Sequence, residues 1–206
     1  MTPNDTQTIH ELFGAGALPD AATVDRLHAR LVEVAERDGL LDVCYRTMES
    51  PYGPLLLVAT TKGLVRVAFD VEGHDAVLAH LATAISPRIL KDQRRLDHAA
   101  AQLDAYFAGR RHEFELDLDL QLSHGFRRNV LMHLRDIEYG ATASYAAIAR
   151  AAGSPAAVRA VGSACATNPL PIVVPCHRVV RSDGSIGQYL GGPDTKRALL
   201  AMESAA

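Results

Sequence analysis

The chain has 206 residues, of which 48% are hydrophobic, and a formal net charge of -3 at pH 7. This length and composition predict a globular protein with one large domain or two small ones, and the net charge argues against nucleic-acid binding through bulk positive charge. No apolar run approaches the roughly 20 residues that span a bilayer. The N-terminus lacks the basic-then-apolar pattern of a signal peptide, so we expect the protein in the cytoplasm.

Charge and cysteine are unevenly distributed. Residues 1–126 hold 12 Lys plus Arg against 19 Asp plus Glu, whereas residues 127–206 hold 9 against 5, so the second part is the one suited to contact phosphates. Cys44, Cys165 and Cys176 are an odd number at wide spacing, which fits neither a disulfide framework nor a zinc site. We therefore expect reduced thiols, with Cys44 and Cys165 structural in their apolar settings, and neither a metal nor a cofactor.

The first 124 residues predict an extension and one domain. Residues 1–44 read as an N-terminal helical extension, with helices at 8–13 and 21–37. Residues 45–124 predict an α/β domain around a small antiparallel sheet. Its expected elements are a hairpin of strands 55–59 and 64–69, helices at 77–84 and 94–107, and a strand at 114–120, where polar and apolar residues alternate strictly.

Residues 125–206 predict a mainly helical domain. Helical spacing replaces the alternation after Gly125, and Ser144 is a candidate N-cap for the next helix. Residues 153–155 turn the chain into a further helix at 156–166, which completes a helix-turn-helix plan. That last helix carries only Arg159 among small side chains, so it is either a tightly packed core helix or a recognition helix that enters a DNA groove.

Residues 168–180 combine a proline-stiffened entry, a short apolar strand and the pair Cys176-His177. A cysteine is a strong nucleophile only as the thiolate, so it needs a neighbouring base or positive field. Adjacent residues of a strand point to opposite faces, so His177 reaches the sulfur only if the chain bends there. The dipeptide alone is also compatible with an inert buried thiol.

The wider stretch from Tyr139 to Glu203 resembles the O6-alkylguanine-DNA alkyltransferase family, also called the methylated-DNA–protein-cysteine methyltransferase family. The family signature, Pro-Cys-His-Arg followed by two β-branched residues, stands intact at residues 175–180. Further pieces match in order: residues 144–145, 159–162, 168–169 and 187–192, then Lys196 and Glu203. The likeness extends more loosely upstream to about residue 45. It implies a ribonuclease H-like N-terminal domain and a winged-helix-like C-terminal domain.

The resemblance also implies roles for single residues. Cys176 would accept the alkyl group irreversibly, His177 would take its proton through a water, Glu203 would orient the histidine, and Asn168 would brace the turn. Tyr145 would donate to N3 of the extruded base, and Arg159 would replace that base in the stack. The DNA-contacting surface would comprise Ser144, Arg159, Ala160, Gly162 and Ser163, and the base pocket Val179, Tyr189, Leu190 and Gly191.

The implied substrate is double-stranded DNA with O6-alkylguanine, or O4-alkylthymine, bound by a monomer that can bind cooperatively. Leu190 departs from the family, because many members have a serine there whose hydroxyl would reach O6. Two other functions remain open. A cysteine hydrolase would use the same side chains but lacks a clear oxyanion hole, and a damage-sensing or regulatory DNA-binding protein would not need Cys176.

Overall fold

The computed structural model describes residues 20–204, and the chain divides into two units between Gly39 and Leu40. The first unit contains the helix α2, Ala21–Arg37. Asp20 caps it, because its side chain accepts a hydrogen bond from the backbone N–H of Thr23 at 2.7 Å. This confirms the predicted helix at 21–37, whereas the one predicted at 8–13 lies outside the described residues.

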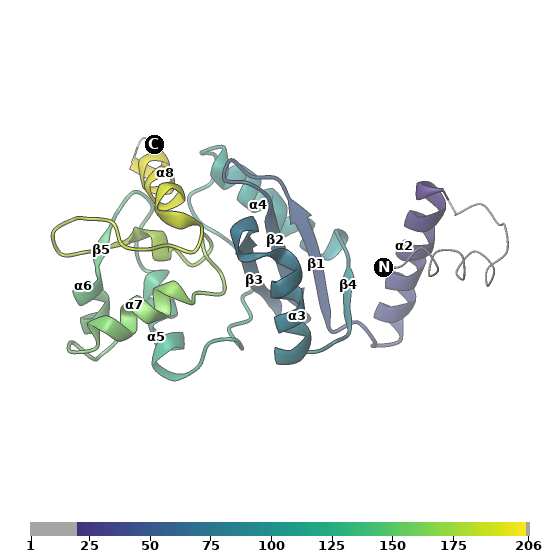
Figure 1. Cartoon of the computed structure of the whole chain (residues 1–206), viewed down its shortest axis with the longest axis horizontal. Coiled ribbons are helices and arrows are strands. Elements are labelled where there is room, and N and C mark those ends of the chain that lie inside the picture. The colour runs from purple at the N-terminus through teal and green to yellow at the C-terminus, as the bar shows by residue number, and fades with distance from the viewer. Residues whose placement is uncertain (1–19, 205–206) are drawn as a thin grey trace, which may run out of the picture. The chain divides into compact units, whose positions relative to one another are not determined.

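The second unit begins with a four-stranded sheet in the order β3-β2-β1-β4 (Figure 1). The strands are β1 (Val43–Met48), β2 (Leu55–Thr60), β3 (Gly63–Phe69) and β4 (Ile89–Lys91). β2 and β3 form the predicted hairpin, with Leu55 opposite Phe69. β4 runs parallel to β1, so the sheet is mixed rather than purely antiparallel. β1 begins at Val43, before the expected domain boundary at residue 45. Val43 and Cys44 are both fully buried, so they belong to the core of the domain.

Two helices cover the two faces of this sheet. Val77 and Leu81 of α3 (His74–Ala84) pack with one set of strand side chains, and Leu103 and Tyr106 of α4 (Asp97–Phe107) pack with the other set. All six residues of β2 are therefore buried, which explains its continuous apolar sequence. Both helices were predicted. Short 3₁₀ turns precede them, Asp70–Glu72 before α3 and Arg94–Leu96 before α4.

The predicted strand at 114–120 is wrong. The alternation is real, since exposed and partly buried residues alternate up to Leu118, but the segment forms only an isolated bridge to Leu64. The side-chain amide of Gln102 instead bonds the backbone N–H of Glu115 at 2.9 Å and its carbonyl at 3.0 Å. A side chain of α4 therefore satisfies backbone groups that a neighbouring strand would otherwise have bonded.

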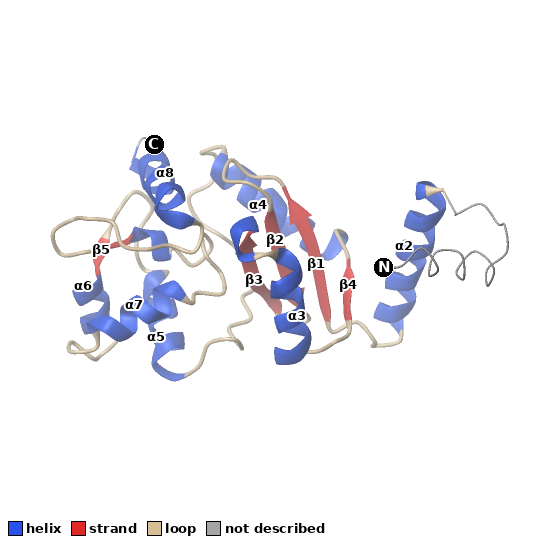
Figure 2. Ribbon diagram, in the orientation of Figure 1, coloured by secondary structure: helices blue, strands red, loops and turns tan. Residues whose placement is uncertain are grey.

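The C-terminal domain is mainly helical (Figure 2). Its helices are α5 (Gly125–Leu134), α6 (Tyr145–Ala151), α7 (Val158–Ala166) and α8 (Gly192–Ser204), and β5 (Ala143–Ser144) pairs in parallel with β6 (Val179–Val180). α6 and α7 form the predicted helix-turn-helix. Ser144 is the N-cap of α6, as predicted, because its hydroxyl accepts from the backbone N–H of Ala147 at 3.1 Å.

The two domains of the second unit share one hydrophobic core. A single cluster of buried side chains runs from Leu57 and Leu103 in the N-terminal domain to Val161 and Val174 in the C-terminal domain. A backbone hydrogen bond of 2.9 Å from the N–H of Val67 to the carbonyl of Pro169 also joins them. Groups on α4 are therefore held in a fixed position relative to the turn that carries Cys176. Across residues 20–204, no helix is both long and apolar enough to cross a membrane.

Candidate active site

Cys176 lies in a compact series of turns rather than after a strand. The short apolar strand expected before Cys176 does not form, because Val174 donates its N–H to the carbonyl of Leu170 at 2.8 Å and the chain then enters a 3₁₀ turn, Cys176–Arg178. Ile172 adopts a φ of 73°, a left-handed conformation that is rare for a β-branched residue. The chain thus bends at Cys176, as a pairing of adjacent Cys and His side chains requires.

Asn168 organises this turn and contacts the sulfur. Its amide nitrogen donates to the carbonyl of Val174 at 2.8 Å and to Sγ of Cys176 at 3.1 Å, while its amide oxygen accepts from the N–H of Leu170 at 3.0 Å. Asn168 is fully buried, so each of these bonds replaces one that water would otherwise make. The contact with the sulfur was not foreseen from the sequence.

The Cys176 thiol requires a base. The residue is 2% exposed, and burial raises the pKa of the thiol to about 11, although the Asn168 hydrogen bond and the charge of Lys196 act in the opposite direction. At neutral pH the sulfur is therefore protonated, and only removal of that proton produces the nucleophilic thiolate.

His177, the next residue in the chain, is fully buried and bonded to Glu203. Its Nε2 lies 2.9 Å from Oε1 of Glu203, and an ionised carboxylate only accepts hydrogen bonds. The neutral imidazole therefore carries its proton on Nε2, and its Nδ1 lone pair has no partner among residues 20–204. Burial lowers the pKa of His177 more than the hydrogen bond and charge of Glu203 raise it, so the ring is neutral and can accept a proton.

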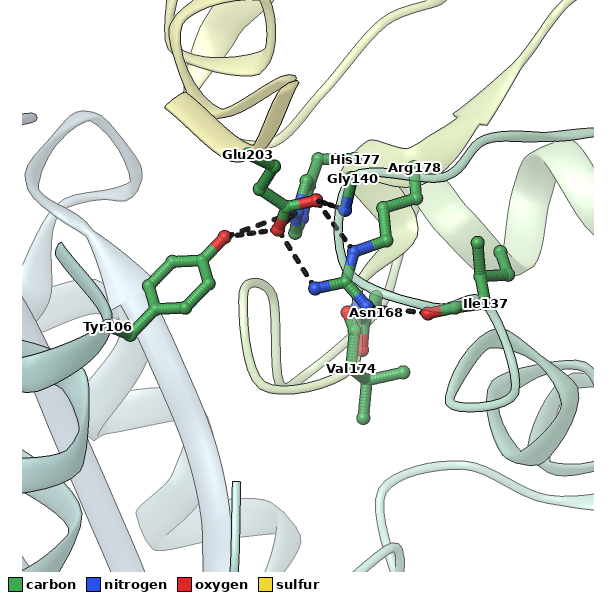
Figure 3. Close-up of polar contacts among 8 residues, drawn as sticks. All are labelled: Tyr106, Ile137, Gly140, Asn168, Val174, His177, Arg178 and Glu203. Atoms are coloured by element: carbon green, nitrogen blue, oxygen red, sulfur yellow. Dashed lines mark hydrogen bonds and ion pairs between the residues drawn. The ribbon is translucent and has the colours of Figure 1, made fainter. Parts of the chain in front are cut away.

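Glu203 is buried within α8, at the centre of a network that Figure 3 shows. Arg178 donates to both of its oxygens at 2.9 Å and also bonds the carbonyl of Ile137 at 2.6 Å. Tyr106 donates to Oε1 at 2.5 Å. Burial raises the pKa of Glu203, but hydrogen bonds from His177, Arg178 and Tyr106 outweigh it and hold the pKa at about 2. The carboxylate is therefore a permanent anion that orients His177.

Tyr145 is the first residue of α6 and is partly buried in the main core cluster. Burial raises the pKa of its hydroxyl, so the phenol keeps its proton and can donate it in a hydrogen bond. A Cβ atom at Gly187 would lie 2.5 Å from Oη of Tyr145, so the backbone of residue 187 must be glycine to approach the phenol this closely.

The segment after Gly187 packs against the N-terminal domain. Tyr189 is 9% exposed, and its ring meets Phe69 edge-on at 5.6 Å between centroids. Gly191 also lies against Phe69, since a Cβ there would be 2.9 Å from the ring. Leu190 is partly buried and lines a cavity of about 440 Å³ together with Pro169.

A buried lysine holds the backbone of the expected base pocket. Lys196 of α8 is 1% exposed, and its Nζ donates to the carbonyl of Val179 at 2.6 Å. The carbonyl of Cys176 accepts the N–H of Val179. Each carbonyl oxygen has a second lone pair that these bonds leave available to a ligand.

The outer face of α7 is exposed. Val161, Ala164 and Cys165 are buried, whereas the opposite side presents Arg159, Ala160 and Ser163, with Gly162 partly exposed. A Cβ at Gly162 would meet nothing within 4 Å. One side of the helix thus belongs to the core, and the other is a smooth surface with a single cation, as a recognition helix needs. Cys165 and Cys44 are both buried, as expected of structural cysteines.

Three further side chains complete the site: Arg178, Lys196 and Tyr106. The sequence did not single them out for these roles. Arg178 belongs to the signature and Lys196 to the matched positions, so their positions were visible but their partners were not. Tyr106 gave no signal beyond an aromatic on an amphipathic helix. Among residues 20–204, no three His, Cys, Asp or Glu side chains are grouped as metal ligands would be.

A helix-turn-helix and a buried cysteine followed by a buried, neutral histidine, in one domain, point to the class of DNA-binding proteins that use a cysteine nucleophile. Comparisons with known families agree. Residues 125–205 match the family described as 6-O-methylguanine DNA methyltransferase, DNA binding domain, and residues 43–120 match its ribonuclease-like domain. The chain therefore belongs to the 6-O-methylguanine DNA methyltransferase family.

Individual relatives are similar over most of their length. The methylated-DNA–protein-cysteine methyltransferase of Mycobacterium tuberculosis is 40% identical over 159 residues, which cover 77% of this chain and 91% of that protein. The crystal structure of the M. tuberculosis O6-methylguanine methyltransferase superposes with a TM-score of 0.70 at 39% identity, over 79% of this chain and 93% of that one. An M. tuberculosis relative in complex with DNA superposes with a TM-score of 0.67. The predicted two-domain fold is thus confirmed.

Proposed function

We propose that this chain repairs alkylated DNA by direct reversal, transferring the alkyl group from O6 of guanine, and also from O4 of thymine, to Sγ of Cys176. Family membership supports a DNA-binding methyltransferase. The observation that carries the assignment to Cys176 is its buried sulfur, which accepts a hydrogen bond from Asn168 and precedes the buried His177–Glu203 pair in a domain with a helix-turn-helix. The protein acts on double-stranded DNA as a monomer that can bind cooperatively.

The transfer begins with the thiol proton. Nδ1 of His177 accepts this proton through a bridging water, and Glu203 stabilises the imidazolium that forms. The thiolate then attacks the alkyl carbon, so that an S–C bond forms as the C–O bond to guanine breaks. Tyr145 delivers a proton to N3 of the departing guanine, which shifts to its ordinary N1–H tautomer. His177 then releases its proton to solution, and Tyr145 regains one from it. The sum of these steps is a thioether on Cys176 and an unmodified guanine.

The base must leave the duplex before this can happen, because a buried sulfur cannot approach O6 within the base stack. Arg159 on the exposed face of α7 takes the place of the extruded base, and Ser144, Ala160, Gly162 and Ser163 approach the DNA closely. The carbonyls of Cys176 and Val179 accept from the exocyclic amine and so select guanine. Tyr189, Leu190 and Gly191 close the pocket.

The reaction stops after one transfer. A thioether has no carbonyl that water could attack, so the alkyl group stays on Cys176 and the protein is consumed. No cofactor takes part in these steps, since the thiol supplies the nucleophile and side chains move the protons.

Mass spectrometry tests the proposal. The protein is incubated with a duplex that contains labelled O6-methylguanine, and intact mass followed by peptide mapping is expected to show one methyl per chain, on Cys176. The variant Cys176→Ala is expected to fold and gain no label. Tight binding of the damaged duplex without any gain in mass would overturn transfer and favour a damage-sensing DNA-binding protein.

A further inference from the structure

Tyr106 reaches the active site from the other domain. It lies in the last turn of α4, is fully buried, and donates its hydroxyl hydrogen to Oε1 of Glu203 at 2.5 Å. The same hydroxyl oxygen lies 3.4 Å from Nε2 of His177. Figure 3 shows the phenol pointing from α4 toward the carboxylate, opposite the guanidinium of Arg178.

The ring of Tyr106 is held tightly by aromatic neighbours. Its centroid lies 5.5 Å from that of Phe107, 5.2 Å from that of Phe114 and 6.0 Å from that of Tyr139. A side chain packed on several sides keeps one rotamer, so the hydroxyl position is fixed by α4 and by the segment that follows it. The donor therefore reaches Glu203 already oriented.

Oε1 of Glu203 is the carboxylate oxygen that contacts His177. It accepts from Nε2 of His177, from a guanidinium nitrogen of Arg178 and from Tyr106. Each additional donor takes up part of the negative charge on that oxygen, so less of it remains to stabilise a proton on the imidazole. Burial and the charge of Glu203 raise the pKa of Tyr106 far above its ordinary value, so the phenol remains a donor at every working pH.

We propose that Tyr106 is a positioning residue for alkyl transfer: its hydroxyl fixes Oε1 of Glu203 and limits the basicity of His177. This inference rests on the proposed function, because it assigns a role within the same reaction. The N-terminal domain thereby supplies a functional group to the site, in addition to its packing surface. Without that group, Glu203 would hold the imidazolium more strongly, and a smaller part of His177 would be neutral and ready to accept the thiol proton.

Other charged and titratable groups also face this network, and the test must separate their effects from that of Tyr106. Arg178 and Lys196 both lower the pKa of His177 through their positive charges, and Tyr189 meets the imidazole edge-on at 6.2 Å. Cys176 lies next to His177 in the chain. Tyr52 and Tyr139 also face the network, and burial and the charge of Glu203 raise the pKa of both hydroxyls. None of these side chains changes in the substitution that follows.

The variant Tyr106→Phe keeps the ring and removes only the donor. Because Tyr106 no longer holds Oε1 of Glu203 in position, we expect the rate of methyl transfer at the pH plateau, where His177 is already neutral, to fall about three- to tenfold, the loss that corresponds to one hydrogen bond. We also expect the acid limb of the pH–rate profile, which reports protonation of His177, to move to higher pH by about half a unit to one unit. Rates are measured with the full chain and a duplex that contains O6-methylguanine.

Tyr139→Phe is the matched control. The hydroxyl of Tyr139 is buried in the same aromatic cluster but has no hydrogen-bond partner among residues 20–204. This control is expected to keep the wild-type profile, and thermal unfolding of both variants tests the packing. A Tyr106→Phe profile that superposes on the wild-type profile would overturn the inference while the proposed function stands. Absence of methyl transfer by the wild-type chain would instead overturn the proposed function.

Discussion

The interior of the C-terminal domain and the outer face of α7 are built in opposite ways. Around Cys176 every polar group is buried and most are paired, as in the bonds that Glu203 makes with Arg178 and Tyr106. The outer face of α7 has small exposed side chains and one cation, Arg159. Its guanidinium has no hydrogen-bond or ion-pair partner among residues 20–204. A buried reaction centre and an exposed recognition surface can cooperate only if the substrate base moves from one to the other.

Substitutions in the two regions are therefore expected to differ in their effects on stability and on reactivity. A change in the buried network removes one partner from groups that cannot turn to water, so it lowers both stability and reactivity. A change on α7 leaves the core intact, so it lowers the reaction with duplex DNA and leaves unfolding nearly unchanged.

The largest effect is expected for Glu203→Gln. The amide cannot neutralise Arg178, which remains buried as an uncompensated charge, so the free energy of unfolding falls by about 3 to 5 kcal/mol. His177 also loses the anion that stabilises its protonated form, so transfer slows at least about a hundredfold. Urea denaturation and single-turnover methyl transfer measure the two effects.

Glu138→Gln is the control for this prediction, because Glu138 is an exposed glutamate of the same domain. It is expected to change neither quantity by more than its experimental error. If Glu203→Gln transferred methyl groups at the wild-type rate, Glu203 would have no role in orienting His177.

The next largest effect is on acid stability. Glu203 has a pKa of about 2 in the fold against an ordinary value of 4.5, so its contribution is complete above pH 4.5 and is lost as the pH falls through 2. The amount is about 3 kcal/mol. His177 has a lowered pKa in the fold, so its contribution is present above about pH 6.5 and begins to be lost below that value.

Urea denaturation over a pH series measures this dependence. Other carboxylates, such as the partly buried Asp42 and the exposed Asp183, also titrate in this range, so the informative quantity is the difference between wild type and Glu203→Gln. That difference is expected to shrink between pH 4.5 and pH 2. Parallel curves over this range would show that Glu203 is not ionised as the network requires.

A smaller and more selective effect is expected for Arg159→Ala. The substitution removes the side chain that fills the base stack, so repair of a duplex slows by about tenfold or more, while reaction with free O6-benzylguanine, which needs no extrusion, stays nearly unchanged. Arg150→Ala, also exposed and on the neighbouring helix α6, is the control. Equal slowing with both substrates would remove Arg159 from the extrusion step.

The sequence predicted those structural features that depend only on residues close together in the chain. The hairpin of β2 and β3 and the N-cap at Ser144 both follow from residues within a few positions of one another. The strand predicted at 114–120 failed because its backbone meets β3 only at Leu64, and at Glu115 it bonds the side chain of Gln102, 13 residues away. A correct periodicity therefore led to an incorrect element.

The contacts of the site that the sequence did not reveal join residues far apart in the chain. Near the C-terminus, Glu203 would ordinarily be a mobile surface residue, yet it is 2% exposed because α8 places it against Arg178. Tyr106 and Glu203 are separated by 97 positions, and no local pattern links them. Such partners become visible only when the two domains share a core.

The smallest effect is expected at the residue that departs from the family pattern. Leu190 is partly buried and lines a cavity beside Pro169 and Thr167, so the hydroxyl in Leu190→Ser would face that cavity as the structure stands. The rate of methyl transfer from duplex DNA should then change by less than about threefold, since an added hydroxyl that does not meet O6 gives the transition state no new hydrogen bond. Leu190→Ala, which loses the same packing without a hydroxyl, is the matched control. A much faster serine variant, with no gain in the alanine variant, would mean that residues 189–191 rearrange when a base enters and carry position 190 to O6. The residues around Cys176 and Glu203 would then keep their positions, whereas residues 189–191 would change conformation when a base binds.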